Sequence, residues 1–152
     1  MDTIVIRKLL KRFKCFKGVY SSNNIPVFKK YPIHIIVNTD PSYKKGSHWV
    51  AITIKQNGRG EYFDSFGLPP LVEDIFNYLE KHCFNGWTYN KNIIQHVTSK
   101  TCGHYCVMYI IYKCSNKSLK SYIKLFSENK VNNDLKLKQL FEKVKLKFFI
   151  SI

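Results

Sequence analysis

The sequence predicts one domain of the α+β class, with a small mixed or antiparallel sheet packed on a central buried helix and further helices around it. Three features carry this prediction. Residues 103–112 are apolar on nearly every helical side, which is typical of a buried helix. Residues 48–63 contain two strand-like segments joined by a tight turn. Helical patterns rich in basic residues occupy both ends of the 152-residue chain.

The first third of the chain predicts a helix and then one short strand. Thr3 can cap the helix, and Gly18 closes it. Its apolar residues have helical spacing: Ile6, Leu9, Leu10, Phe13 and Phe16. Residues 21–24 then form a turn. Residues 33–37 are apolar and rich in β-branched side chains, which indicates a buried strand, and residues 38–46 form a polar loop.

A β-hairpin is predicted in the middle of the chain. Residues 48–54 read as a strand, the Asn-Gly pair at 57–58 is a strong turn signal, and residues 60–63 return as the partner strand. His48 therefore begins one strand and Asp64 ends its antiparallel neighbour. The turn alone places these two residues side by side at one end of the sheet.

The rest of the chain predicts, in order, one helix, one strand and three further helices. A helix is expected between the Pro-Pro pair at 69–70 and the Asn-Gly pair at 85–86. Its apolar residues are Leu71, Ile75, Tyr78 and Leu79. Residues 87–97 predict another strand, which leads to the central helix. Two basic helices follow, at about 119–128 and 134–149.

The composition indicates a globular protein with a polyanionic partner. Hydrophobic residues make up 45% of the chain, and 25 Lys and Arg against 10 Asp and Glu give a net charge of +15. This exceeds the roughly 2–8 charges that solubility asks of a small domain. Nucleic acid is the first candidate partner, and an acidic membrane surface is the second. The alternative is that the charge has no partner and only keeps the protein in solution. No apolar stretch approaches the ~18 residues that span a bilayer.

The excess charge is concentrated at the two ends. Eight Lys and Arg lie in residues 1–30 and ten in residues 113–147, against one and three acidic residues. We expect DNA binding without sequence specificity, unless these residues are only a solvated helix face. The candidate contacts are Lys120, Lys124, Lys136 and Lys138, together with Arg7, Lys8, Lys11 and Arg12.

Five cysteines, an odd number, follow no regular spacing, and the sequence shows no N-terminal signal peptide. This pattern favours a reducing, intracellular compartment with free thiols. A zinc site is the rival chemistry, and the available ligands are Cys102, Cys106, His104, His82 and Cys83. We expect no metal, because no pair among them has the spacing of a zinc site with a matching second half.

Cys102 is a candidate nucleophile. It lies at the N-terminal tip of the predicted central helix, where free N–H groups and the helix dipole favour a thiolate. His48 and Asp64 could supply a base and a group that orients it. Each residue alone has a simpler explanation: a structural histidine, a buried cysteine, an aspartate that caps a turn. The combination of the three matches acyl-transfer catalysis.

Several short motifs occur in an order that resembles the adenovirus protease (adenain) family. They are Gly46-Ser47-His48-Trp49, Tyr62-Phe63-Asp64-Ser65-Phe66-Gly67, and Gln95 followed seven residues later by Cys102-Gly103. Further matches are Ile36-Val37-Asn38-Thr39 and the segment 13–20. The resemblance covers about residues 13–112. The C-terminal third aligns poorly, so the chain is similar to divergent forms found in other double-stranded DNA viruses and virus-like elements.

The resemblance implies a cysteine endopeptidase with an α+β fold, related to the SUMO-deconjugating proteases. His48 would be the general base, and Asp64, where adenoviruses often carry Glu, would orient it. Gln95 would donate its amide to the oxyanion, with the Cys102 backbone N–H as second donor. Trp49 would pack at the site.

The resemblance also implies partners. Its substrates would be viral structural precursor proteins, cut at Gly-containing sites in the virion or the host nucleus, with DNA as an activator. In adenovirus a peptide also activates through a cysteine upstream of the Gln, but the offset of Cys83 differs, so this part of the resemblance does not carry over to Cys83. The same site could instead remove ubiquitin-like modifiers, or the chain could be an inactive DNA-binding module. We expect a monomer.

Overall fold

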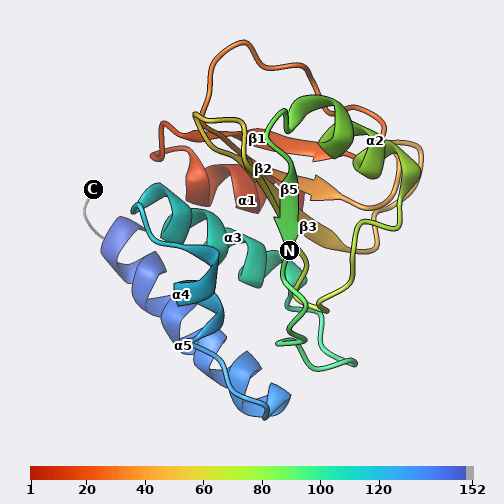
Figure 1. The fold of residues 1–152 in the computed structure, drawn as a ribbon. Helices are drawn as coiled ribbons and strands as arrows, with labels where there is room; N and C mark the ends of the chain where they lie inside the picture. Colours follow the sequence, from red (N-terminus) through yellow and green to blue (C-terminus); the bar gives the residue numbers. More distant parts are fainter. Residues whose placement is uncertain (150–152) are drawn as a thin grey trace.

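The computed structural model describes residues 1–149 and contains a five-stranded sheet with helices on both faces (Figure 1). The strands are β1 (Phe16–Ser21), β2 (Ile33–Asn38), β3 (Trp49–Ile54), β4 (Gly60–Phe63) and β5 (Trp87–Tyr89). The helices are α1 (Thr3–Leu10), α2 (Glu73–His82), α3 (Cys102–Cys114), α4 (Leu119–Ile123) and α5 (Lys130–Phe149).

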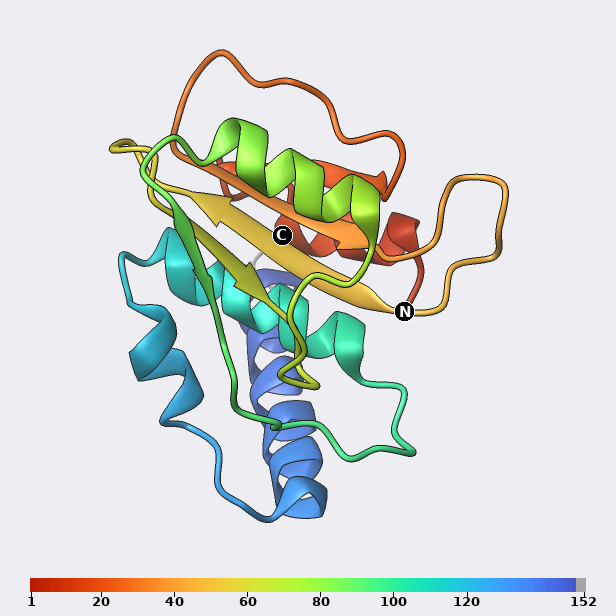
Figure 2. The same cartoon turned by 45° about the vertical axis from the view of Figure 1, so that its right-hand side comes forward.

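The sheet is mixed, as the sequence predicts. Its strands lie in the order β1-β2-β3-β4-β5. The inner pairs β2–β3 and β3–β4 are antiparallel, whereas β1 joins β2 and β5 joins β4 in parallel. Figure 2 shows α2 on one side of this sheet and α3 to α5 on the other. The predicted α+β arrangement is thereby confirmed.

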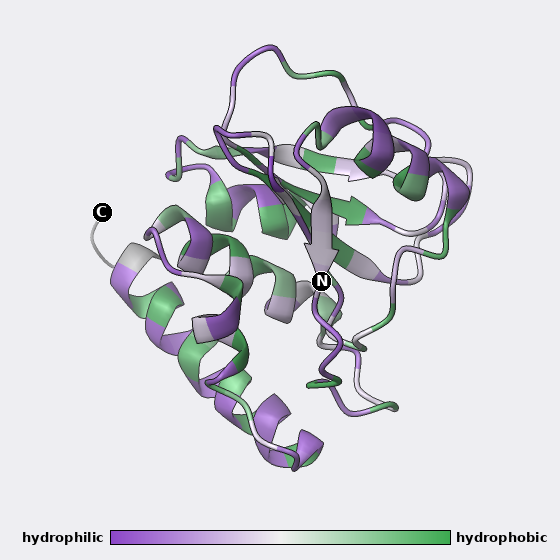
Figure 3. Cartoon of the chain, viewed as in Figure 1, coloured by the Kyte–Doolittle hydropathy of each residue, from purple (hydrophilic) through white to green (hydrophobic). Residues whose placement is uncertain are grey.

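Two apolar clusters follow from the alternation of side chains along the strands. On one face Ile36, Ala51 and Phe63 pack with α3, and on the other Ile35 and Ile52 pack with α2. Helix α3 has eight buried residues, in accord with the prediction of a central helix. Figure 3 shows hydrophobic residues along α3 and β2. In α5, hydrophobic residues alternate with hydrophilic ones. No helix in residues 1–149 is both long and apolar enough to cross a membrane.

The N-terminal segment differs from the prediction. Helix α1 ends at Leu10, and Phe16 belongs to strand β1 instead of continuing the helix. Pairing with the edge of β2 overrides the helical spacing of Phe13 and Phe16. Asp2, not Thr3, caps α1, since its side chain accepts a hydrogen bond from the Val5 N–H.

Four later boundaries also differ. Helix α2 begins at Glu73, after the Pro-Pro pair instead of at it. Strand β5 ends at Tyr89, because the following residues turn towards the end of β4: the N–H groups of Ile94 and Gln95 both bond the Ser65 carbonyl. Helix α4 is a single short element and α5 begins at residue 130, four residues earlier than predicted.

A disulfide joins Cys15, just before β1, to Cys114 at the end of α3. The expectation of free thiols is therefore wrong for this pair. The reason is proximity in the fold, which sequence spacing does not reveal: the two residues are 99 positions apart. Cys83, Cys102 and Cys106 are free.

A buried ion pair connects the sheet to α3. Lys113 contacts Glu61, and both residues are 8% exposed. The Thr53 hydroxyl also donates to Glu61, at 3.4 Å, and the Tyr109 hydroxyl does so at 3.5 Å. Because these neighbours cannot replace a lost charge, removing one ionic partner leaves the other buried and uncompensated.

We expect Glu61→Ala to destabilise the fold by roughly 3–5 kcal/mol, because Lys113 then lacks a counter-charge. The double variant Glu61→Leu/Lys113→Met should recover most of this loss. Urea unfolding followed by circular dichroism measures both. Equal loss in the single and double variants would show that side-chain packing, not the unpaired charge, determines the effect.

Candidate active site

The predicted pair His48 and Asp64 lies together at one end of the sheet. The Nε2 atom of His48 is 2.8 Å from Oδ1 of Asp64. His48 immediately precedes β3, and Asp64 immediately follows β4, so the hairpin positions both. Phe66 stacks on the imidazole, with ring centroids 5.1 Å apart. The ring is therefore fixed in place on one edge and on one face.

Asp64 is itself held by backbone and side-chain contacts. Its Oδ1 accepts a second hydrogen bond from the Phe66 N–H at 2.8 Å. The buried Asn90 side chain spans its backbone, accepting from the Asp64 N–H at 2.9 Å and donating to the Asp64 carbonyl at 2.5 Å. Asn90, the residue after β5, thus fixes the backbone that carries the carboxylate.

The tight turn after Asp64 needs glycine. Gly67 has φ +66°, and its N–H donates to the Asp64 carbonyl at 2.8 Å. A Cβ there would lie 2.9 Å from backbone atoms of Lys91 and Asn92. The turn can therefore pack directly against the segment that leads to Gln95.

Cys102 is the first residue of α3, and its thiol interacts with the side chain of His48, which lowers the thiol pKa. Since Nε2 faces Asp64, Nδ1 is the ring nitrogen left for the sulfur. The backbone groups of Trp49 and Gly103 also act to lower the thiol pKa. A Cβ on Gly103 would lie 3.2 Å from the Trp49 ring, so the glycine lets Trp49 pack beside the nucleophile.

The two partners shift each other's pKa towards an ion pair. Burial alone lowers the pKa of His48, but the hydrogen bonds to Asp64 and Cys102 outweigh it and raise that pKa to about 9. Burial alone raises the pKa of Cys102, but the hydrogen bonds from His48, Trp49 and Gly103 outweigh it and lower that pKa. Both shifts move the pair in the direction of a thiolate beside an imidazolium.

Gln95 is almost fully buried and oriented at both ends of its amide. Its Oε1 accepts from the Ser65 hydroxyl at 2.5 Å, and its Nε2 donates to the Ser99 carbonyl at 2.9 Å. These contacts use one of the two Nε2 hydrogens. Gln95 and Cys102 line the same cleft, so the second hydrogen can reach a group bound there.

Two depressions meet at the site. The first, of about 730 Å³, contains Cys102 and a polar, basic wall that includes Arg7, Lys44, Lys45 and Lys100. The second, of about 820 Å³, is mainly apolar and is lined by residues such as Leu68, Ile93, Val97 and Val131. Phe66 and Gln95 belong to both depressions. An extended chain crossing this boundary would meet basic side chains first and apolar ones next.

Three positioning residues were not foreseen. Ser65 and Phe66 adjoin Asp64 in the sequence, and that adjacency was the available signal. Asn90 carried no signal, because only the parallel pairing of β4 with β5 brings it beside Asp64.

The rival metal ligands do not assemble. Cys106 is buried in the core and donates to the Trp49 carbonyl at 3.3 Å, and Cys83 lies in the cluster under α2. Within residues 1–149, His, Cys and carboxylate groups come together as a possible metal site only at Cys15, His34 and Cys114. This group lies outside the set considered from the sequence.

The eight basic candidates for DNA contact are all exposed: Lys120, Lys124, Lys136, Lys138, Arg7, Lys8, Lys11 and Arg12. The first four lie on α4 and α5 or at the end of α4, and both helices lie on the α3 side of the sheet (Figures 1 and 2). The Lys136 ammonium reaches across to the Leu125 carbonyl, at 2.6 Å. The other four belong to α1 and the turn that follows it.

No protein-family model and no curated protein sequence matches this chain. Among solved structures, it is similar to the ASFV pS273R protease, with 27% identity, 69% of this chain and 42% of that chain covered, and a TM-score of 0.44. It is also similar to ChlaDub1 from Chlamydia trachomatis, with 14% identity, 75% of this chain and 60% of that chain covered, and a TM-score of 0.52. A third similar structure is the central domain of Lpg1148 from Legionella pneumophila, with 13% identity, 85% of this chain and 88% of that chain covered, and a TM-score of 0.48.

The chain thus spans less than two thirds of the first two proteins it resembles. The likeness to ChlaDub1 is one of fold: a mixed α/β domain, which in this chain has the candidate nucleophile at the start of the central helix.

The ion pair predicts how Cys102 reacts with iodoacetamide. We expect rapid alkylation of Cys102 at pH 7 in the wild type, because the lowered pKa keeps the sulfur as a thiolate. In His48→Ala the rate at pH 7 should fall roughly tenfold or more, since an ordinary thiol is only a few per cent ionised there. Mass spectrometry of the labelled peptide between pH 5 and 10 measures both profiles. Identical profiles would mean that His48 does not stabilise the thiolate.

Proposed function

We propose that this chain is a cysteine endopeptidase that cleaves viral structural precursor proteins during virion maturation, with DNA as an assisting partner. One observation carries the proposal: His48 bonds the Asp64 carboxylate at 2.8 Å and interacts with the Cys102 side chain, so that each of the two shifts the pKa of the other. This is the nucleophile, base and orienter arrangement of covalent acyl transfer. The motif resemblance to the adenain family supports the viral substrate class.

The residues suggest the following reaction. The Cys102 thiolate attacks the scissile carbonyl carbon, and the resulting oxyanion accepts from the free Nε2 hydrogen of Gln95 and from the Cys102 backbone N–H. The His48 imidazolium then gives its proton to the leaving amine, which departs and leaves a thioester. His48, now neutral, takes a proton from water, and the hydroxyl attacks the thioester. Thiolate and imidazolium are restored when the carboxylic acid is released.

The two depressions indicate what the substrate looks like. Lys44, Lys45 and Lys100 would favour acidic side chains on one side of the scissile bond, because their charges lie along the cleft wall. The apolar groove beyond Gln95 would take aliphatic side chains on the other side. Removal of ubiquitin-like modifiers would use the same catalytic groups. A competition between the two kinds of substrate, not the active-site chemistry, would therefore distinguish the two functions.

We expect wild-type protein to cleave members of a peptide library, with acidic residues enriched on one side of the cut and aliphatic residues on the other. Cys102→Ala should abolish cleavage and keep the fold, because it removes only the attacking atom. Cys106→Ala, one turn further along the same helix, is the matched control and should retain activity. Mass spectrometry identifies the cuts. Cleavage by Cys102→Ala, or an inert wild type that iodoacetamide still labels, would refute the endopeptidase.

DNA binding is proposed on separate grounds, from the exposed lysines of α4 and α5. If about six phosphates are contacted, the logarithm of the binding constant should fall with that of salt at a slope near −5. Changing Lys120, Lys124, Lys136 and Lys138 to Glu should flatten the slope and leave hydrolysis of a small peptide unchanged. Fluorescence anisotropy of a labelled random duplex measures the slope.

The control carries the same charge change elsewhere: Lys29, Lys30, Lys55 and Lys81 to Glu, all exposed and away from α4 and α5. It should bind DNA more strongly than the α4–α5 variant. Equal weakening in both would indicate an effect of net charge alone, and no binding at low salt would remove DNA from the proposal.

A further inference from the structure

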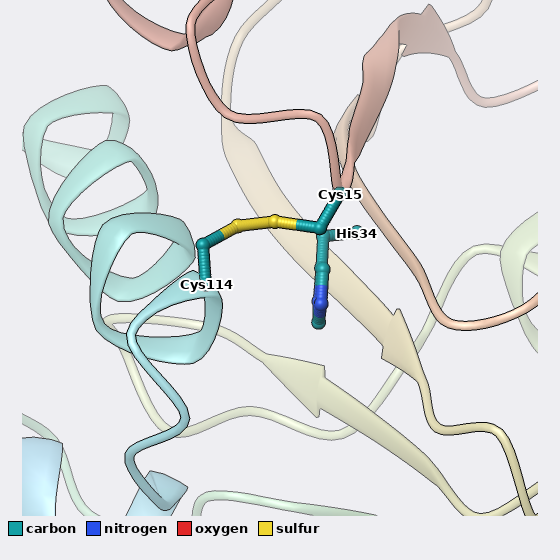
Figure 4. A group of neighbouring side chains, drawn as sticks. All are labelled: Cys15, His34 and Cys114. Carbon is teal, nitrogen blue, oxygen red and sulfur yellow. A yellow bond between two sulfur atoms is a disulfide. The ribbon is translucent and has the colours of Figure 1, made fainter.

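Three side chains far apart in the sequence meet at the end of α3 opposite the nucleophile. Cys15 comes from the segment before β1, His34 from β2 and Cys114 from the last turn of α3 (Figure 4). Their two sulfur atoms and a ring nitrogen of His34 all lie within 4.8 Å of one another. Since α3 has 13 residues, this group lies about 18 Å along the helix from Cys102. It is therefore separate from the catalytic groups.

His34 is a buried histidine with an unsatisfied ring atom. It is 6% exposed, and its Nδ1 atom has no hydrogen-bond partner within residues 1–149. Buried polar atoms of native proteins almost always have a partner, and an ion or a water commonly fills the gap. A disulfide beside the imidazole does not meet this need, because disulfide sulfur is a weak hydrogen-bond acceptor.

The charge state of the group suits a cation once the disulfide is reduced. Two thiolates would supply two negative charges. A neutral imidazole and two thiolates are the donor set that zinc prefers, and they balance its charge.

The spacing also suits zinc. With Zn–S near 2.3 Å and Zn–N near 2.0–2.1 Å, donors on a tetrahedral ion lie roughly 3.5–3.8 Å apart. The three atoms here are already within 4.8 Å, so reduction of the disulfide and small side-chain movements would complete the geometry. Cys15 and Cys114 are only half-buried, which leaves access for a water as the fourth ligand.

We propose that the reduced chain binds one Zn²⁺ through Cys15 Sγ, Cys114 Sγ and a ring nitrogen of His34, and that the disulfide is the metal-free form of the same site. A dithiol or two monothiols reduce the disulfide and are themselves oxidised to a disulfide. Zinc binding then releases the two thiol protons. Both forms link the segment before β1 to α3, so the link to the catalytic helix persists in either redox state.

The test uses the full chain with Cys102→Ser, so that the reactive thiolate cannot chelate. The protein is reduced with a phosphine in the absence of air and titrated with Co²⁺, then with Zn²⁺. We expect one Co²⁺ per chain, with the near-ultraviolet absorption of thiolate–cobalt bonds, displaced by one Zn²⁺. The oxidised protein should bind neither ion at the same concentrations.

His34→Gln separates the metal site from the disulfide. It should still form the disulfide on reoxidation, which a thiol count verifies, but bind Co²⁺ at least tenfold more weakly. His104→Gln is the matched control, because His104 also has a buried, unpartnered Nδ1 but lies near no cysteine pair. Its Co²⁺ affinity should be unchanged.

A second variant, Cys15→Ser, should lose both the metal and the disulfide, and it stands in if His34→Gln does not fold. Three results would overturn the proposal: no Co²⁺ binding by the reduced chain, wild-type affinity in His34→Gln, or undiminished thiolate–cobalt absorption in Cys15→Ser. The last would assign the signal to Cys83 or Cys106.

Discussion

The hydrogen bond between His48 Nε2 and Asp64 Oδ1, at 2.8 Å, joins the ends of two neighbouring strands and determines how the rest of the site is built. With Nε2 occupied, Nδ1 is the ring nitrogen left for the sulfur at the tip of α3. The carboxylate is held in turn by the Phe66 N–H and by Asn90 at its backbone. Sheet, turn and helix thus converge on one imidazole, and its protonation controls that of Cys102.

The part of this site that depends on local chain geometry could be predicted from the sequence. The Asn-Gly turn fixes the register of β3 and β4, so the proximity of His48 and Asp64 follows directly from it. The all-round apolar run after Cys102 likewise placed α3 in the core with its start exposed to the cleft. Gln95 came from motif resemblance, and the structure places it in the same cleft as Cys102.

What could not be predicted depends on contacts between distant segments. The spacing of Phe13 and Phe16 predicts helix up to the start of strand β1, whereas pairing with the edge of β2 draws this segment into the sheet. The Cys15–Cys114 disulfide and the Glu61–Lys113 ion pair likewise join residues that no local pattern relates. Helix α3 connects the candidate nucleophile at its start to these contacts at its end, so the position of Cys102 depends on groups about 18 Å away.

The central claim is that His48 is a cation stabilised between two anions, and its own titration tests this most directly. Nitrogen-15 NMR of the labelled imidazole should show His48 protonated at pH 7.5, with a pKa of about 9. Because Asp64 and Cys102 both raise that pKa, Asp64→Asn and Cys102→Ala should each lower it. A ring that is neutral at pH 7.5 in the wild type, or a pKa that neither variant changes, would contradict the ion pair on which the proposed reaction depends.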